Sequence, residues 1–301
     1  DPLPESLLRA GRFDYKITFN APNIKDYAEI VKHYLAGKNL ATDVSLDDIS
    51  KMIAYGSCAE LESVINGAAA NAAFARRDCI AMSDIVSSVI QNSYNFCGNI
   101  ESFSEENRRR ISVHEAGHIV ASEVLVPESV GFASMQCHGY DDDGVGFTHY
   151  CKNQCNTRNI IITSLAGKAA TDLLFPEDCS GGCHSDFRKA YENIRDMIES
   201  GSYGIGFMEI YCYRPLSNPT AQRSADYVVR AELERYMRIA RELLIKNRKF
   251  LEKAASALSQ KGYLLHSDIQ KIRKSITIPN ANFVNPLLNT YAEGNDEVCN
   301  F

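Results

Sequence analysis

The residues of this sequence best suited to chemistry are His114, Glu115 and His118, which stand in the run His-Glu-Ala-Gly-His. On an α-helix, residues four positions apart share a face, so both histidines can offer a ring nitrogen to one metal ion. Glu115 projects to the side of that face, where it can activate a zinc-bound water without ligating the metal itself. Two ligands plus a general base in this order are typical of zinc-dependent peptide hydrolysis. The alternative is a pair of helix histidines that are hydrogen-bonded in a core.

A catalytic zinc site needs a third protein ligand. The extended pattern with a third histidine further along the same helix fails, because Ala121 and Val124 occupy the places of its glycine and histidine. Glu123 and Glu128 lie in or just beyond the same helix, so neither can readily fold back onto the ion. The third ligand is therefore expected from another part of the chain.

The run Gly-Gly-Cys-His-Ser-Asp at 181–186 offers better candidates for that ligand. Asp186 follows a flexible glycine pair and falls in the first turn of a predicted helix. A carboxylate at that place is also a common structural feature of helix N-termini. Cys183 and His184 are rival ligands in the same loop, so the residues alone leave the choice open.

The elements that must position these residues are predicted to be mainly α-helical, in a small helical domain followed by a mostly helical domain with a small β-hairpin. Residues 130–150 change to a period of two and predict two strands around a turn, at 132–137 and 145–150. The expected helices cover residues 27–35, 45 onward with Ser45 as N-cap, 58–74, 82–91, 104–124, 157–175, 184–200 with Ser185 as N-cap, 221–258 with a break near 246–247, and 267 onward.

Composition limits the classes of function open to the chain. With 301 residues and a net charge of -6, it is long enough for two domains, and no basic excess points to nucleic acid or to an anionic membrane. No uninterrupted apolar stretch of roughly 18 residues occurs, so we expect no membrane-spanning segment in this chain. Ten cysteines without a secretion signal predict mostly reduced thiols. The pairs Cys151/Cys155 and Cys179/Cys183 could together bind a structural zinc, but scattered thiols are the favoured interpretation.

Several segments resemble, in order, the FtsH family of AAA+ membrane-anchored zinc proteases. Residues 106–118 resemble the helix leading into the family's His-Glu-Ala-Gly-His, residues 165–170 its Gly-Gly-Arg-Ala-Ala type core, and residues 180–186 the segment with its third ligand. The resemblance continues through residues 201–204 and the long C-terminal helix. It implies Asp186 as the third ligand of one catalytic Zn²⁺, unfolded polypeptides as substrates, and a homo-hexameric ring.

The N-terminal third of the chain resembles the end of an AAA+ ATPase. Residues 1–20 are similar to the last part of its core, which implies that Arg9 and Arg12 are arginine fingers. Residues 21–95 then correspond to the helical lid, in which Cys58 replaces a usual glycine. The remaining ranges follow as a linker at 96–103, a peptidase domain at 104–275 and an extended or disordered tail at 276–301.

The parent protein is expected to be larger than this chain. The sequence contains no Gly-x-x-x-x-Gly-Lys-Ser/Thr phosphate loop, so ATP and Mg²⁺ are expected only in a full-length parent and no ATPase activity from this chain alone. By resemblance, the peptidase lies on the cytoplasmic side of a membrane anchor that is located outside this chain.

Residues 144–148 are predicted to hold the substrate. Gly144, Val145, Gly146, Phe147 and Thr148 belong to an expected edge strand beside the metal, to which an extended peptide can add as a further strand. The two glycines would let the backbones approach each other. The alternative is a plain hairpin strand with a bulge.

The sequence thus predicts a zinc endopeptidase and leaves two alternatives. One is a non-catalytic chaperone or assembly subunit that retains zinc. The intact Glu115 argues against it, because metal binding does not need that carboxylate. The other is a structural module on four cysteines with an incidental helix motif.

Overall fold

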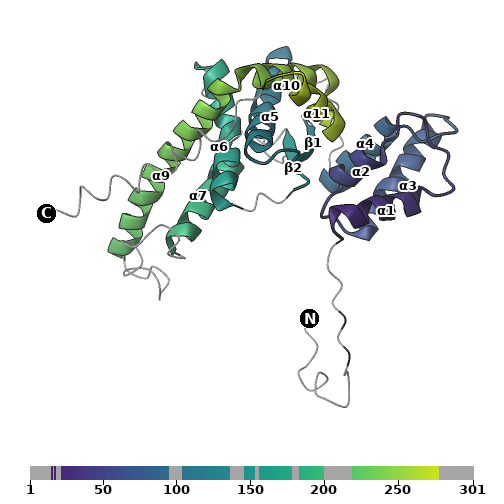
Figure 1. Cartoon of the computed structure of the whole chain (residues 1–301), viewed down its shortest axis with the longest axis horizontal. Coiled ribbons are helices and arrows are strands. Elements are labelled where there is room, and N and C mark those ends of the chain that lie inside the picture. Colours follow the sequence, from purple (N-terminus) through teal and green to yellow (C-terminus); the bar gives the residue numbers. More distant parts are fainter. Residues whose placement is uncertain are drawn as a thin grey trace.

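The fold is mainly α-helical with a small antiparallel sheet, as the sequence predicts (Figure 1). The computed structural model describes residues 15, 17, 22–94, 104–135, 146–152, 156–177, 183–199 and 219–277. Several predictions fall outside these residues: those on Arg9 and Arg12, on Gly144 and Val145, on Cys155 and Cys179, on the linker, and on nearly all of the tail.

The first part of the chain forms a group of helices, α1 (Ile24–Leu35), α2 (Leu46–Met52), α3 (Cys58–Phe74) and α4 (Met82–Tyr94), drawn in purple and blue in Figure 1. Side-chain caps define where two of them begin. The Ser45 hydroxyl accepts a hydrogen bond from the Asp48 amide, as predicted, and Ser57 and Glu60 form a reciprocal capping box. The helices bury a shared apolar cluster that includes Val31, Ile49, Leu61, Ile65 and Ile85.

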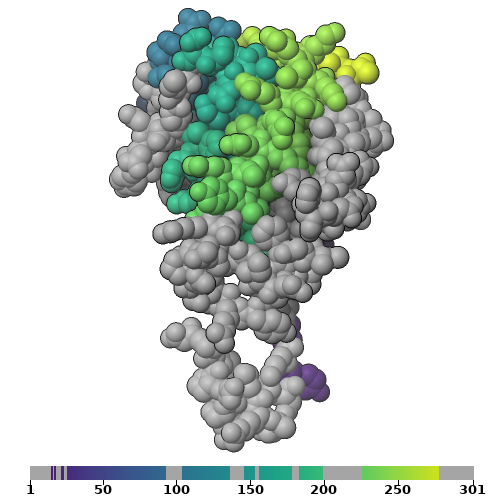
Figure 2. Space-filling model, turned by 90° about the vertical axis from the view of Figure 1, so that its left-hand side faces the viewer, coloured from purple at the N-terminus to yellow at the C-terminus, as the bar shows by residue number. Residues whose placement is uncertain are grey.

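The second part of the chain is built around α5 (Glu105–Leu125), which carries His114, Glu115 and His118. Helices α6 (Thr157–Leu174) and α10 (Arg248–Lys261) pack directly against it. Helix α7 (His184–Glu199) and the long α9 (Pro219–Lys246) lie along α6, and Figure 2 shows α9 in green beside the teal helices. The break predicted near 246–247 is confirmed, because Asn247 separates α9 from α10.

A three-stranded sheet closes one side of α5. Strands β1 (Val130–Ser134), β2 (Phe147–Tyr150) and β3 (Tyr263–Leu265) pair antiparallel in the order β2-β1-β3, which leaves β2 at an edge. The strand predicted at 132–137 is observed two residues earlier. Strand β3 was not predicted, because three residues between α10 and α11 (His266–Lys274) are too short to show a period.

The sheet also joins the two parts of the chain. The register of β1 against β2 shifts between Val130 and Phe132, at Gly131. A Cβ atom at Gly131 would come within 2.1 Å of the Lys51 carbonyl oxygen at the end of α2. The Asp48 carboxylate of α2 accepts a hydrogen bond from the Ser267 amide of α11 at 2.8 Å. Helix α2 therefore lies directly against the sheet and α11.

The buried carboxylate of Glu123 anchors the end of α5 to its surroundings. It accepts hydrogen bonds from the amides of Glu128 and Val130 and from the Gln270 side chain, each at 3.0 Å. Arg273 of α11 lies 3.7 Å away as a charge partner. Glu123 is thus occupied in fixing β1 and α11, which agrees with its exclusion as a metal ligand.

None of the helices in the described ranges is both long and apolar enough to cross a bilayer.

Helices α5 and α6 approach so closely that residue 117 has no room for a side chain. A Cβ atom at Gly117 would lie 2.4 Å from the Ala166 carbonyl oxygen and 2.8 Å from the Ala170 Cβ. The two helices are therefore in tight contact at this glycine.

We predict that Gly117→Ala lowers the free energy of unfolding by about 1–3 kcal/mol, because the added methyl group overpacks the contact between α5 and α6. Helix propensity alone would raise stability by about 1 kcal/mol, so the sign of the change distinguishes the two effects. Denaturant unfolding measures it. Gly67→Ala on α3 is the comparison, because its Cβ would meet the side-chain atoms of Ser88 and Asn92 and not a backbone carbonyl, so its cost comes from displacing the Ser88 hydroxyl and not from separating two helix backbones. An unchanged or raised stability of Gly117→Ala would contradict the close approach.

Candidate metal centre

Helix α5 presents both histidines on one face, as their spacing predicts. The helix begins after Ser104, whose hydroxyl accepts from the Asn107 amide at 3.2 Å. From Ser112 to Val124 every residue except His114 is buried, so this segment passes through the middle of the fold. The rings of His114 and His118 lie edge to face with their centroids 4.8 Å apart. Their Nε2 atoms converge to 3.1 Å.

Asp186 completes a group of three ligand atoms. Its Oδ2 lies 3.1 Å from His114 Nε2 and 3.2 Å from His118 Nε2. Three ligand atoms around one tetrahedral zinc, each about 2.0 Å from the metal, are separated by about 3.3 Å. The three observed separations are close to that value, and the donor set of two imidazoles and a carboxylate suits zinc. These residues therefore fit the ion that the sequence implies.

The position of α7 brings one of the three candidates for the third ligand, Asp186, to the two histidines. Asp186 lies in the first turn of α7, and α7 packs against α6. Among the described residues, His114, His118 and Asp186 are the group of histidine, cysteine and acidic side chains close enough to share a metal. His184 and Cys183 do not join it. The prediction of Ser185 as N-cap is wrong, because α7 already begins at His184.

Helix α6 contacts both histidine side chains. The Thr163 carbonyl oxygen lies 2.7 Å from His118 Nδ1, so this nitrogen donates, and Nε2 is the nitrogen that would bind a metal after losing its proton. A Cβ atom at Gly167 would come 2.5 Å from His118 Nε2 and 2.6 Å from His114 Nε2. The imidazoles can reach their positions only because residue 167 has no side chain.

Glu115 is buried beside this group and is held by β2. The Thr148 hydroxyl donates a hydrogen bond to Glu115 Oε2 at 2.8 Å. A Cβ atom at Gly146 would come 2.5 Å from Glu115 Oε1, so the backbone just before β2 presses on the carboxylate. Of the residues predicted to hold a substrate strand, Gly146, Phe147 and Thr148 are described, and two of them contact the candidate base.

The charges of the site are strongly interdependent. Burial would lower the pKa of His118, but the charge and hydrogen bond of Asp186, the charge of Glu115 and the Thr163 carbonyl together outweigh it and raise that pKa to about 9. Burial would raise the pKa of Asp186, but the charge of His118 and hydrogen bonds from both histidines hold it well below its usual range. Burial raises the pKa of Glu115, against the opposing charges of the histidines and the Thr148 hydrogen bond. A raised pKa suits a carboxylate that must accept a proton near neutral pH.

The alternative of a four-cysteine zinc site is not tested by the described residues, which include only two of the four cysteines. Cys151 and Cys183 are free thiols, Cys151 being buried, while Cys155 and Cys179 lie outside the described ranges. Burial raises the pKa of Cys151 to about 11, so it remains a neutral thiol at pH 7.

Sequence reasoning did not assign roles to Thr148, Thr163 or Gly167 at the metal centre. Thr148 was placed in the substrate strand, but its bond to Glu115 depends on how β2 pairs with β1. Gly167 lies in a segment that carries the family resemblance, and this could have signalled a close approach. Thr163 acts through its carbonyl, which leaves no trace in residue type.

A helix with two histidines four apart, the adjoining glutamate and a carboxylate from a second helix together define the class of H-E-x-x-H metal centres. Comparison with known proteins narrows the class. The chain is 30% identical over 301 residues to the ATP-dependent zinc metalloprotease FtsH of Thermus thermophilus, an alignment that covers 92% of the chain and 47% of that protein. It is 29% identical over 295 residues to the protein of the same name from Caldicellulosiruptor bescii, covering 90% of the chain and 47% of the relative.

The chain therefore belongs to the FtsH family of ATP-dependent zinc metalloproteases, and it corresponds to a C-terminal portion of them. It spans about half the length of the curated relatives it matches. No family model matches the chain.

We predict that zinc affinity falls as pH falls, by about tenfold per pH unit between pH 8 and pH 6. Below a pKa of about 9, His118 carries a proton that zinc must displace, so each binding event releases a proton. Competition with a chelator at several pH values measures the slope. Asp186→Asn removes the charge that raises this pKa, so it should weaken binding and move the pH dependence to lower pH. An affinity that does not change between pH 8 and pH 6 would contradict the assignment.

We predict that Thr148→Val slows peptide hydrolysis by about 10- to 100-fold, because it removes a hydrogen bond to a buried charged group while keeping the shape of the side chain. The loss should appear in kcat, with zinc content unchanged, since Thr148 contacts the candidate base and no candidate ligand. Thr148→Ser keeps the hydroxyl and should restore most of the rate. Equal losses in both variants would show that packing, and not the hydroxyl, is what matters.

Proposed function

We propose that this chain is the peptidase portion of an ATP-dependent protease and that it hydrolyses unfolded polypeptides as a zinc endopeptidase. The observation that carries the proposal is the convergence of His114, His118 and Asp186 on one point, with Glu115 buried beside it. A structural metal site would not need Glu115, because a closed site uses all four positions for ligands and requires no base.

The side chains divide the chemistry among themselves. A zinc ion held by the three ligands would make a bound water more acidic and polarise the peptide carbonyl. Glu115 accepts a proton from that water as the water oxygen bonds to the carbonyl carbon, and it returns the proton to the amine that leaves when the C–N bond breaks. Thr148 and Gly146 hold the Glu115 carboxylate in place during both transfers.

The substrate is proposed to lie along β2. This strand is at the edge of the described sheet and can pair with an extended peptide through main-chain hydrogen bonds, which tolerate many sequences. Phe147 and Thr148 would pair with the peptide, and Gly144, Val145 and Gly146 would admit its backbone. Because Thr148 also bonds to Glu115, a peptide on β2 would pass directly beside the base.

The remaining parts are proposed from the family. Residues 21–95 would form the ATPase lid and residues 104–275 the peptidase domain, with Arg9 and Arg12 reaching a neighbouring subunit's nucleotide in a homo-hexamer. ATP and Mg²⁺ would act in the full-length protein, whose peptidase would face the cytoplasm. The direct contact of α2 with β1 and α11 supports a lid that is closely joined to the peptidase.

We predict that Glu115→Gln lowers the rate of casein cleavage by about 100- to 10,000-fold, because glutamine cannot accept the proton. Zinc content should stay at one ion per chain, since Glu115 is not among the proposed ligands. Glu128→Gln is the control, because Glu128 lies in the loop after α5 and bonds to Lys152 at the surface. Full activity of Glu115→Gln would rule out the base. Bound zinc with no cleavage of any unfolded substrate by the unmodified chain would favour a chaperone or assembly subunit.

A further inference from the structure

The two faces of the small sheet contact different parts of the molecule. Side chains alternate along a strand, so neighbouring residues point to opposite faces. Ala133 of β1 and Leu264 of β3 belong to the apolar core around α5. Their neighbours Phe132 and Leu265 belong instead to the apolar cluster of the first helical group, α1 to α4. The sheet therefore lies between the two parts of the chain, as Figure 1 also shows.

Strand β2 continues this division from one residue to the next. Thr148 faces α5 and donates its hydrogen bond to Glu115 at 2.8 Å. Phe147 and His149, on either side of Thr148, share the opposite face. Phe147 packs against the cluster of the first helical group, and its ring centroid lies 5.6 Å from that of Phe132. One short strand thus connects the candidate base with the first helical group.

His149 makes a polar contact on that opposite face. Its ring is hydrogen-bonded to the backbone of Ala54, in the loop that follows α2. Burial lowers the pKa of His149, and the bond to Ala54 opposes this effect in part. A bond that raises the pKa of an imidazole is one that the ring donates, so Ala54 contributes its carbonyl. The ring is neutral at pH 7, and the contact is a hydrogen bond and not an ion pair.

The loop that carries Ala54 is held firmly in place. Ala54 is only 2% exposed. The next residue, Tyr55, has a φ of 69°, in the left-handed region that bulky residues rarely adopt. The Gly56 amide then donates to the Ile53 carbonyl at 3.0 Å and closes the turn. A backbone of this kind persists only where its surroundings fix it, so the loop offers His149 a partner in a defined position.

The Glu115 carboxylate is sensitive to small movements of β2. A Cβ atom at Gly146 would come 2.5 Å from Glu115 Oε1, so the strand has no room to move closer. Movement away would break the bond from Thr148. In the described sheet, β2 is at an edge and pairs with β1 alone, so it has a strand neighbour on one side only. The contact between His149 and Ala54 is a second restraint on its position.

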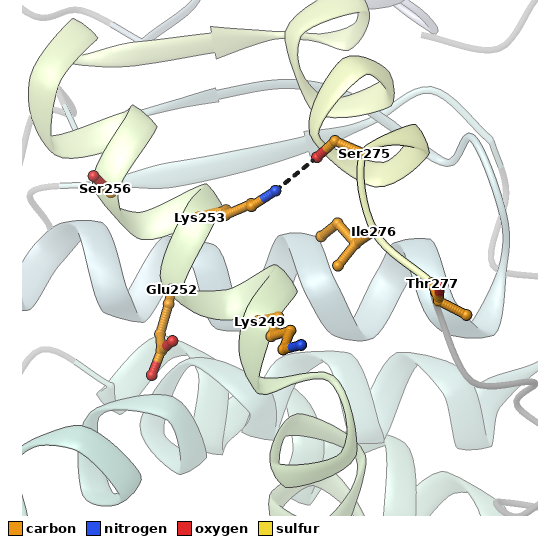
Figure 3. A pocket seen from close by; sticks show the side chains of 7 residues that line it. All are labelled: Lys249, Glu252, Lys253, Ser256, Ser275, Ile276 and Thr277. Atoms are coloured by element: carbon orange, nitrogen blue, oxygen red, sulfur yellow. Dashed lines mark hydrogen bonds between the residues drawn. The ribbon is translucent and has the colours of Figure 1, made fainter.

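A hollow between α10 and the residues after α11 takes no part in this connection (Figure 3). Lys253 donates to Ser275 there at 3.0 Å. Its lining comes from α10 and residues 275–277, and includes no residue of α2, β2 or α5. It offers no route between Ala54 and Glu115.

We propose that His149 is a positioning residue for the peptidase reaction. By holding β2 to the loop after α2, it keeps Thr148 where the hydroxyl orients the Glu115 carboxylate. This inference rests on the proposed peptidase function. It makes the first helical group part of the catalytic arrangement, because β2 is fully restrained only while His149 is in contact with Ala54.

The first test compares two substitutions of His149 in the zinc-loaded chain. His149→Leu cannot donate a hydrogen bond, and it should lower kcat for a quenched peptide by about 5- to 20-fold, with KM and zinc content unchanged. His149→Gln can still donate to the Ala54 carbonyl and should keep kcat within about threefold of the unmodified chain. Ile85→Val is the control for lost stability, because it shortens a core side chain on α4, outside the sheet and the loop after α2. It should lower the midpoint of unfolding and leave kcat unchanged.

The second test asks whether His149 acts through Thr148. In the Thr148→Val chain no hydroxyl remains to orient Glu115, so adding His149→Leu should lower kcat by less than about twofold further. Losses that multiply in the double variant would overturn the proposal. A loss confined to KM, or equal losses in His149→Leu and His149→Gln, would overturn it as well.

A third measurement separates this proposal from the proposed function. Hydrogen exchange followed by mass spectrometry reports on β2 without any need for cleavage. In His149→Leu, exchange of the amides at 147–152 should be about tenfold faster, with α3 and α5 unchanged. This result supports the role of His149 in holding β2 even if the unmodified chain cleaves nothing. Unchanged exchange together with unchanged kcat overturns that role and leaves the peptidase proposal intact.

Discussion

The close approach of α5 and α6 is the constraint on which the rest of this structure depends. Neither Gly117 on α5 nor Gly167 on α6 has room for a Cβ atom. At Gly117 the backbones of the two helices meet, and at Gly167 the backbone of α6 meets the two imidazoles of α5. This contact brings the Thr163 carbonyl to His118 and lets both imidazoles pack closely against Gly167 of α6. Because α7 packs on α6, the same contact also fixes the distance from the histidines to Asp186. A shift between the helices of about 1 Å would separate the three ligand atoms.

Helix α5 carries two buried glutamates whose surroundings differ, and the difference suits one to a structural role and the other to the proposed chemistry. Glu123 accepts hydrogen bonds from two backbone amides and from Gln270, with Arg273 3.7 Å away, and so holds β1 and α11 in place. Glu115 has a single hydrogen-bond donor among the described residues, Thr148, and burial raises its pKa. A buried carboxylate with so few donors is costly unless a cation or a proton compensates it. This difference in surroundings supports Glu115, and not Glu123, as the proposed base.

The first helical group is physically continuous with the metal centre. Its helix α2 touches the bulge of β1 at Gly131 and caps the start of α11 through Asp48. The loop after α2 meets His149 of β2 through Ala54.

The sequence by itself determined the helices, the Ser45 cap and the facing pair His114 and His118, because these depend on residues within a few positions of one another. It placed Glu115 beside that face, for the same reason, and it excluded Glu123 as a ligand. It left Asp186, Cys183 and His184 as rivals until the family resemblance favoured the aspartate. The tertiary structure set Asp186, and not its rivals, against the histidines, and it added β3, the Thr148 bond and the Gly167 contact. These involve residues distant along the chain, whose meeting depends on how α5, α6, α7 and β2 pack together, and packing leaves little trace in local sequence.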